Sequence, residues 1–314
     1  MSDHQFKFGM YLPELGLPFD QALATAKDIG ADYVWFNRLD EASPSIRDLS
    51  DAEIDRMGER VAEHGLEIFL LGAGNPFKEL HLADLDLDTM TEHPAFHQEF
   101  DDMVRSMQIA ARLGIGAVNI FTFAWPGEYT AGKPTWPMRW LTRGGYIADV
   151  DMEKLVKALS LALDEAERYD VDLVLSMMSW NYTNTTGNFR RLADALGSKR
   201  LKAMWGPADT LNCGEWDTAT AGFHNIRPYL YGLHIKDTHI EDGLQLKFSW
   251  QPLGEGDVDF ITILRNLREH SSDITLSVAT HFVPPSGSRE EAMRINFNNL
   301  KRLVQESADL DSSS

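Results

Sequence analysis

Short apolar segments alternate with longer amphipathic segments along nearly the whole chain. The short segments are rich in β-branched and aromatic residues, which is typical of the buried strands of a parallel sheet. They predict strands at Lys7–Leu12, Tyr33–Asn37, Glu67–Leu71, Ala117–Phe123, Asp172–Met177, Leu201–Trp205, Tyr231–Ile235 and Thr275–Ala279.

The longer segments repeat apolar residues at three- and four-residue spacing, as helices with one buried face do. They predict helices at Phe19–Ile29, Asp51–Glu63, Phe100–Leu113, Met152–Tyr169, Phe189–Leu196, Phe260–Arg268 and Arg289–Gln305. Ser50 or Asp51 can cap the start of the second helix. Glycines stand where a left-handed residue commonly ends a helix, at Gly30, Gly65, Gly114 and Gly197.

This repeated strand and helix pattern predicts one (β/α)8 barrel domain over residues 1–308. Closure of the barrel removes the edges that a long open parallel sheet would expose. A dinucleotide-binding fold is disfavoured, because Leu71–Gly74 contains glycines but no G-x-G-x-x-G segment opens a helix there. The Asp- and Ser-rich end, residues 309–314, is expected to be a disordered tail.

Two predicted loops, at about 73–94 and 125–151, are unusually long. Each follows the carboxyl end of a strand, which is the face where barrel enzymes build their active sites. The second loop is suited to stacking on a sugar or an aromatic ring, and equally to packing as a lid on its own barrel or on a neighbouring subunit. Its aromatic and basic residues are Trp125, Tyr129, Trp136, Trp140 and Tyr146, with Lys133, Arg139 and Arg143.

The formal net charge of −19 disfavours nucleic acid and anionic membrane surfaces as partners, because it would repel their phosphates. Cys213 is the one cysteine, so no internal disulfide can form. The sequence has neither a secretory signal pattern at its start nor an uninterrupted apolar run of about 18 residues. We therefore expect a cytoplasmic protein.

Polar residues cluster at the predicted strand ends. In the seventh strand, His234 and Lys236 share one face, which in a barrel is the interior. A buried histidine beside a lysine needs partners, so it serves either a site or a satisfied core network. Asp237 is instead expected to cap the following segment. The strand-end candidates are Glu14, Asn37, Arg38, Asn119, Ser176, Trp180, Asn181, Asp209, His234, Lys236, Asp237, His239 and His281.

Five ordered segments carry a resemblance to the xylose isomerase-like sugar phosphate isomerases and epimerases. They are Phe19–Ala31, Ala110–Asn119, Tyr231–Asp237, Pro252–Phe260 and Leu276–Phe282. Each segment is a weak signal alone, but their order is specific and the similarity extends over nearly the whole chain. The resemblance implies a (β/α)8 barrel and a carbohydrate substrate.

The resemblance also implies one divalent ion, held by Glu, Asp, His and Glu on strands five to eight, which polarises a carbonyl. Ser176, Gly206 and Ala279 stand where the three carboxylates are expected, and only His234 matches. One imidazole cannot hold a divalent ion against water, so we expect the site to be absent or rebuilt from His234, Asp209 and His281. The cofactor is left open between Mn, Mg, Co or Zn and no metal.

The first functional hypothesis is an isomerase, epimerase or lyase acting on a monosaccharide, keto-sugar or related polyol by proton transfer next to a carbonyl. His234 or Asp209 would act as the base, and Lys236 would stabilise an enolate or, less in keeping with the family, form a Schiff base. The expected substrate-binding residues are Trp180, Asn181, Trp205, His281 and Asn37.

The alternative hypothesis is a catalytically silent homologue that binds a sugar or pairs with an active homologous subunit. The loss of three ligand positions in one site supports this alternative. A DNA endonuclease of the same fold is disfavoured, because it needs a metal cluster and a surface that tolerates phosphate. A homo-oligomer is left open by the sequence.

Overall fold

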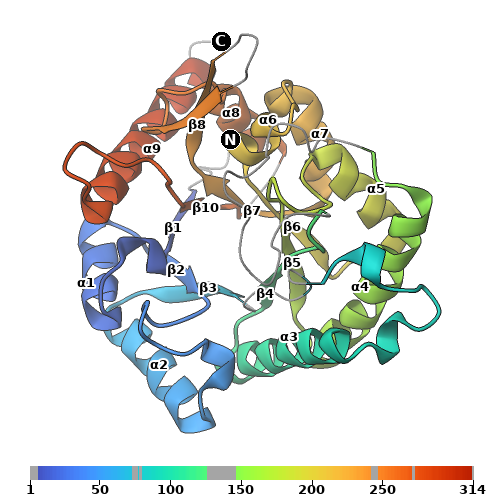
Figure 1. Cartoon of the computed structure of the whole chain (residues 1–314). Helices are drawn as coiled ribbons and strands as arrows, with labels where there is room; N and C mark the ends of the chain where they lie inside the picture. The colour runs from blue at the N-terminus through green and yellow to red at the C-terminus, as the bar shows by residue number, and fades with distance from the viewer. Residues whose placement is uncertain are drawn as a thin grey trace.

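Eight parallel strands close into a barrel in the order β1-β10-β7-β6-β5-β4-β3-β2, with the helices forming a ring outside it (Figure 1). This computed structural model describes residues 6–72, 77, 80–125, 146–241, 247–270 and 273–312. The architecture confirms the predicted (β/α)8 barrel. The barrel strands are β1 (Lys7–Tyr11), β2 (Tyr33–Phe36), β3 (Glu67–Gly72), β4 (Ala117–Ile120), β5 (Asp172–Ser176), β6 (Leu201–Trp205), β7 (Leu230–Ile235) and β10 (Thr275–Val278).

Every predicted helix is present, and several begin earlier or end later than their apolar spacing indicates. The last helix reaches Ser312, past residue 308, where the sequence analysis ended the barrel. Short helical segments that the periodicity did not predict follow β6. The helices are α1 (Phe19–Ile29), α2 (Asp51–Glu63), α3 (Pro94–Leu113), α4 (Asp149–Tyr169), α5 (Thr186–Leu196), α6 (Pro207–Asn212), α7 (Phe223–Ile226), α8 (Phe260–His270) and α9 (Arg289–Ser312).

The helix ends follow the predicted capping chemistry. Ser50 and Glu53 form a capping box at the start of α2, in which the Ser50 backbone N–H donates to Glu53 Oε2 at 2.8 Å. Four glycines adopt a positive φ directly after helices, where other residues would be strained. They are Gly30, Gly65, Gly114 and Gly197.

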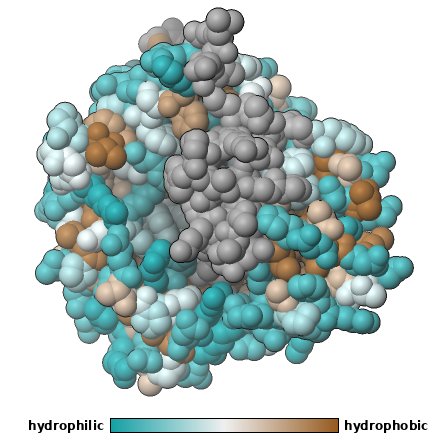
Figure 2. Space-filling model, in the orientation of Figure 1, coloured by the Kyte–Doolittle hydropathy of each residue, from teal (hydrophilic) through white to brown (hydrophobic). Residues whose placement is uncertain are grey.

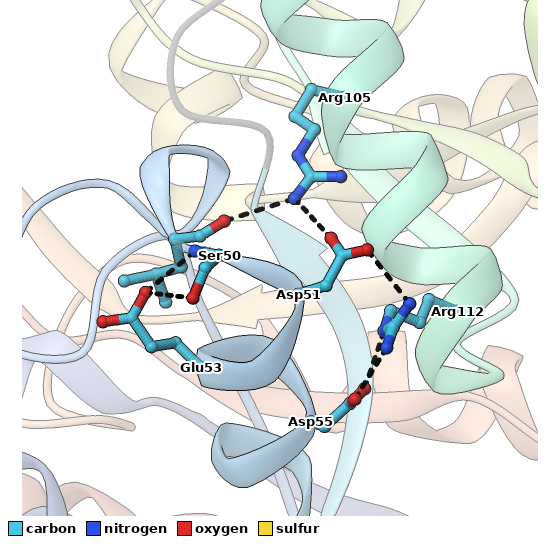
Figure 3. Close-up of polar contacts among 7 residues, drawn as sticks. Ser50, Asp51, Glu53, Asp55, Arg105 and Arg112 are labelled. Atoms are coloured by element: carbon cyan, nitrogen blue, oxygen red, sulfur yellow. Dashed lines mark hydrogen bonds and ion pairs between the residues drawn. The ribbon is translucent and has the colours of Figure 1, made fainter.

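A polar network joins the start of α2 to α3 (Figure 3). Asp51 accepts hydrogen bonds from Arg105 Nη2 at 3.0 Å and from Arg112 Nη1 at 3.2 Å. Arg112 also pairs with Asp55, with Nη2 lying 2.6 Å from Oδ2. These side chains are largely exposed, so each pair contributes only a few tenths of a kcal/mol, and their main effect is to align the two helices.

The apolar interior is divided by the wall of the barrel. Trp35, Leu70, Ala117, Val174 and Met204 form a separate cluster inside the barrel. The larger cluster lies between the outside of the strands and the helices. This division follows from the alternation of side chains along each strand.

A two-stranded antiparallel hairpin follows β7 and was not predicted. Strand β8 (Asp237–Glu241) pairs with β9 (Lys247–Gln251), and Figure 1 shows β8 on the side of the barrel where α8 and α9 lie. Four of the ten residues in these two strands are exposed to solvent, and the strands lack the continuous apolar run by which the barrel strands were predicted. It carries Trp250 to within 5.5 Å of the Lys236 ammonium nitrogen.

The outer surface is mainly hydrophilic on the face shown in Figure 2, where hydrophobic residues lie between polar ones on the ring of helices. The polar positions of the amphipathic helices therefore face outward, as their spacing predicts. Within the described ranges, no helix combines the length and the apolar character that crossing a bilayer requires.

Asp237 organises the loop that follows the hairpin. Its carboxylate accepts backbone N–H hydrogen bonds from Thr238 at 2.8 Å, Gly254 at 2.9 Å, Gly256 at 3.0 Å and Val258 at 3.3 Å. A side chain at Gly256 would overlap with this carboxylate and with the Thr238 carbonyl oxygen. The structure thus confirms that Asp237 caps the next segment.

We expect Asp237→Ala to lower the free energy of unfolding by about 2–4 kcal/mol, because it leaves several buried N–H groups without an acceptor. Asp237→Asn should cost less, since it keeps one acceptor oxygen. Urea unfolding at neutral pH measures both, with exposed Glu255→Ala in the same loop as the control. Equal midpoints for Asp237→Ala and Glu255→Ala would contradict this role.

Candidate active site

A cavity of about 380 Å³ lies at the carboxyl ends of β1 and β10, on the face where barrel enzymes bind their substrates. Its lining is rich in polar and charged side chains. The polar and charged lining residues include Tyr11, Glu14, Arg38, Glu41, His281 and Arg289.

A buried ion pair lies beside this cavity. Lys236 Nζ, just after β7, is 2.9 Å from Asp209 Oδ2 in the first turn of α6. The two side chains are 3% and 0% exposed. Burial raises the pKa of Asp209, and the Lys236 charge opposes that rise. The structure therefore brings together two of the three predicted catalytic residues.

Gly206 makes room for this ion pair. A side chain built on Gly206 would overlap with Asp209 Oδ2, so the Asp209 carboxylate fills the volume into which a residue at position 206 would project. Gly206 is the position where the resemblance expects the carboxylate of the sixth strand. A carboxylate is thus present near this point, but it comes from helix α6 and is already bound to an ammonium group.

His234 lies inside the barrel, as the alternation along β7 predicts. Its ring is 5% exposed and stacks on Trp35, with ring centroids 5.2 Å apart and planes inclined by 13°. Trp35 is held in turn by a 3.0 Å hydrogen bond from Nε1 to Ser277 Oγ. Among the described residues, none forms a hydrogen bond with the buried Nε2 of His234.

The charge state of His234 follows from these surroundings. Burial lowers its pKa well below the usual value, and the charge of Lys236 and the neighbouring His281 add to the effect. The imidazole is therefore neutral at physiological pH. A neutral ring with an unused nitrogen can accept a proton from a ligand.

Glu14 lies in the 3-10 turn η1 (Leu12–Leu15) that follows β1, and it lines the cavity. Its Oε2 is buried and has no hydrogen-bond partner among the described residues. Burial raises the pKa of Glu14 to about 8, against the opposing charge of Lys236. From the sequence, Glu14 is only one of the polar strand-end residues, because its chain neighbours do not reveal that its Oε2 is buried.

His281 and Asn37 also lie at this end of the barrel. His281 lines the cavity, and its ring centroid lies 4.8 Å from that of Trp250. The surrounding protein and the Lys236 charge lower the pKa of His281. Asn37 Oδ1 accepts a 3.0 Å hydrogen bond from the Tyr11 hydroxyl, and Tyr11 lines the cavity.

Of the predicted catalytic and substrate-binding residues, which the structure describes in full, His281 alone lines the cavity. Three of the others are buried elsewhere. Trp180 is 2% exposed, with its ring 5.1 Å from the ring of Phe121. Asn181 is fully buried and donates from Nδ2 to the Ser176 carbonyl at 2.9 Å. Trp205 belongs to the core cluster outside the barrel. These side chains make contacts within the protein.

His239 is likewise outside the site. It lies on β8 with an exposed side chain, and its Nδ1 is 3.1 Å from Asp257 Oδ2. Tyr129, Lys133, Trp136, Arg139, Trp140 and Arg143 of the predicted lid loop lie outside the described residues. At the edges of that loop, Trp125 stacks on Tyr182, with centroids 4.2 Å apart.

Sequence reasoning missed Trp250 and Arg289, which reach the site from the hairpin and from the start of α9. Neither residue lies at the carboxyl end of a predicted barrel strand. The two aromatic residues of β9, Phe248 and Trp250, alternate with polar residues, and this pattern could have indicated a short strand.

The described residues do not fit the divalent ion that the resemblance implies. At the expected ligand positions, Ser176 Oγ accepts a 2.7 Å hydrogen bond from Asn119, and Gly206 and Ala279 have no donor side chain. Asp209 is held by Lys236, whose positive charge would oppose a bound cation. Across the described part of the chain, no three His, Cys, Asp or Glu side chains are grouped as metal ligands.

A family model described as a xylose isomerase-like TIM barrel matches residues 23–303 of the chain. None of the curated protein sequences compared with the chain matches it.

Several solved structures share the fold over nearly their full length. The IolI protein with a bound zinc atom is 18% identical, with a TM-score of 0.69 over 96% of this chain and 99% of that one. L-ribulose 3-epimerase is 14% identical, with a TM-score of 0.68 over 98% and 97%. The 3-keto-D-glucoside 4-epimerase of E. coli is 15% identical, with a TM-score of 0.65 over 95% and 99%. At these identities the likeness shows the fold.

Removing the Lys236 side chain should leave the buried charge of Asp209 without its ion-pair partner. We expect Lys236→Met to lower the free energy of unfolding by about 3–5 kcal/mol at neutral pH. Without Lys236 the pKa of Asp209 rises further, so the loss should grow as the pH is raised above the ordinary pKa of an aspartate. Urea unfolding at pH 5 and pH 8 measures this trend.

Lys199→Met, at an exposed lysine before β6, is the matched control. The double variant Lys236→Met/Asp209→Leu should regain most of the lost stability, because neither charge remains. If Lys236→Met loses the same free energy of unfolding relative to the wild type at pH 5 and at pH 8, Lys236 does not stabilise the charge of Asp209.

Proposed function

Because the chain belongs to the xylose isomerase-like TIM-barrel family, we propose that it is an isomerase, epimerase or lyase of carbohydrates. Its substrate is a monosaccharide, a keto-sugar or a related polyol, transformed by proton transfer next to a carbonyl. The observation that carries this proposal is the buried Lys236–Asp209 ion pair, 2.9 Å across, beside a cavity at the catalytic face of the barrel. The sugar epimerases among the similar structures support the substrate class.

Lys236 supplies the positive charge for this chemistry. When a proton leaves the carbon next to a carbonyl, negative charge develops on the carbonyl oxygen, and a fixed ammonium group stabilises it. Asp209 holds the Lys236 ammonium in place before the substrate binds, and the Trp250 ring lies 5.5 Å from it and limits access of water. The Lys236 ammonium group is already bound to Asp209, so we do not propose a Schiff base.

His234 is the base. Its imidazole is neutral, and its Nε2 has no hydrogen-bond partner among the described residues, so it is available to take the proton from carbon. Asp209 is a weaker choice, because a proton on its carboxylate would weaken the contact with Lys236. Protonation of the enolate on the opposite face of the same carbon would give epimerisation, and protonation of the neighbouring carbon would give isomerisation. Expulsion of a β-hydroxyl group, protonated as it leaves as water, would give elimination.

This chemistry requires no divalent ion. The substitutions at Ser176, Gly206 and Ala279 remove the anionic ligands of such an ion, and the Lys236 ammonium provides a positive charge instead. The ammonium group carries one positive charge where a divalent ion carries two, and the site correspondingly has fewer carboxylates.

The alternative is a catalytically silent homologue that binds a sugar or pairs with an active subunit. The same three substitutions favour this alternative, since they remove the usual catalytic centre. The buried Lys236–Asp209 ion pair argues against the silent homologue. Burying two charges costs free energy of hydration, and a protein that only binds a sugar gains little from that cost.

A proton-exchange assay distinguishes the two. We expect purified protein, incubated in D2O with a panel of aldoses, ketoses, keto-sugars and inositols, to introduce deuterium next to the carbonyl of its substrate, as measured by proton NMR. His234→Ala should reduce this exchange on the order of 10²-fold or more, because the base is removed. Exposed His224→Ala is the control. Exchange at the wild-type rate in His234→Ala would remove His234 from the mechanism, and no exchange with any sugar would favour the silent homologue.

Elemental analysis tests the metal-free site. Protein purified without chelators should contain substoichiometric Mn, Co and Zn, and its turnover should persist in EDTA, because the described residues offer no ligand set. One equivalent of metal, lost together with activity in EDTA, would instead indicate a site rebuilt from His234, Asp209 and His281.

A further inference from the structure

Four carboxyl groups of the described residues near the mouth of the barrel differ in their partners. Asp237 accepts four backbone N–H hydrogen bonds. Asp209 pairs with Lys236 through Oδ2 at 2.9 Å, and it does not line the cavity. Its buried Oδ1 has no hydrogen-bond partner among the described residues. Glu41 pairs with Arg289 at 2.6 Å and is largely exposed. Glu14 is the fourth, and its buried Oε2 has no hydrogen-bond partner among the described residues.

The position of Glu14 suits contact with a ligand. The turn η1 places it directly after β1, and it lines the same cavity as Tyr11 and His281. A buried carboxyl oxygen without a partner costs free energy unless it serves another purpose, such as binding a hydroxyl group of the substrate. The chain tolerates this cost at the face where substrates of barrel enzymes bind.

We propose that Glu14 is the catalytic acid of this site, which donates its proton to the enolate that Lys236 stabilises. This inference rests on the proposed function. The base removes a proton from carbon, and the electron pair of the C–H bond passes to the carbonyl oxygen. The Glu14 O–H bond then breaks and its proton bonds to a carbon of the enolate. The electron pair on oxygen re-forms the carbonyl, and Glu14 is left as a carboxylate. After product release, the proton held by the base returns to Glu14 through solvent.

The surrounding charges allow Glu14 to hold a proton at neutral pH. Burial raises the pKa to about 8, and the nearby Asp209 charge adds to the rise. Lys236, the Thr280 backbone N–H and Arg289 act in the opposite direction. The hydroxyl of the neighbouring Tyr11 remains protonated, since burial and the Glu14 charge raise its pKa to about 12. An acid that titrates near the working pH transfers protons efficiently.

Glu14→Gln tests the inference, because glutamine matches a protonated glutamate in shape and cannot release a proton. Glu63→Gln, at an exposed residue where α2 ends, is the matched control. Infrared difference spectra of a pH titration should show a protonated carboxyl band at pH 7 that disappears near pH 8 in the wild type and in Glu63→Gln. The band should be missing in Glu14→Gln, whose urea midpoint at pH 7 should equal that of the wild type.

The pH dependence of turnover of the substrate found in the D2O assay supplies the second measurement. Wild-type kcat/KM should fall above about pH 8, where the acid is lost. In Glu14→Gln this fall of kcat/KM at high pH should disappear, and kcat should be lower on the order of 10²-fold. Glu63→Gln should keep the wild-type kcat and the wild-type pH dependence. If Glu14→Gln keeps the wild-type kcat and the wild-type fall of kcat/KM above pH 8, the role of Glu14 is overturned while the proposed function stands. Absence of turnover in the wild type would overturn the proposed function as well.

Discussion

The ion pair between Lys236 and Asp209 sets the electrostatics of the barrel mouth. Two fully buried charges cost several kcal/mol each in lost hydration, and only their close contact offsets that cost. The contact depends on Gly206, because any side chain there would overlap with the Asp209 carboxylate. The positive charge of Lys236 in turn helps to keep His234 neutral and limits the rise in the pKa of Glu14. The protonation states of the site are therefore coupled through one lysine.

Adjacent residues at the end of β7 perform separate tasks. Lys236 forms the buried ion pair with Asp209, while Asp237 ties the hairpin to the loop before α8. That hairpin carries Trp250, which lies over Lys236 and beside His281. The structural role of Asp237 thus supports the site indirectly, since the loop it organises fixes the base of the hairpin. Loss of either residue would affect both stability and the geometry of the site.

The family fold and the contents of the site give different information. The barrel, the strand order and the inward histidine are those expected of a xylose isomerase-like protein. At the positions where the resemblance expects the remaining ligands, the chain has Ser176, Gly206 and Ala279, none of which is a carboxylate. A function proposed for this chain therefore has to be argued from Lys236, Asp209, His234 and Glu14, because fold alone does not specify chemistry.

The sequence by itself determined the barrel, the helix caps, and the inward direction of His234 and Lys236. These features depend on periodicity and on neighbours close in the chain, which a linear pattern records. Only the tertiary structure decided that Asp209 fills the space beside Gly206, that Trp35 stacks on His234, that Trp250 covers Lys236, and that Glu14 is enclosed. The physical reason is burial: the charge and reactivity of these groups depend on which distant segments exclude water from them, and no local pattern encodes that arrangement.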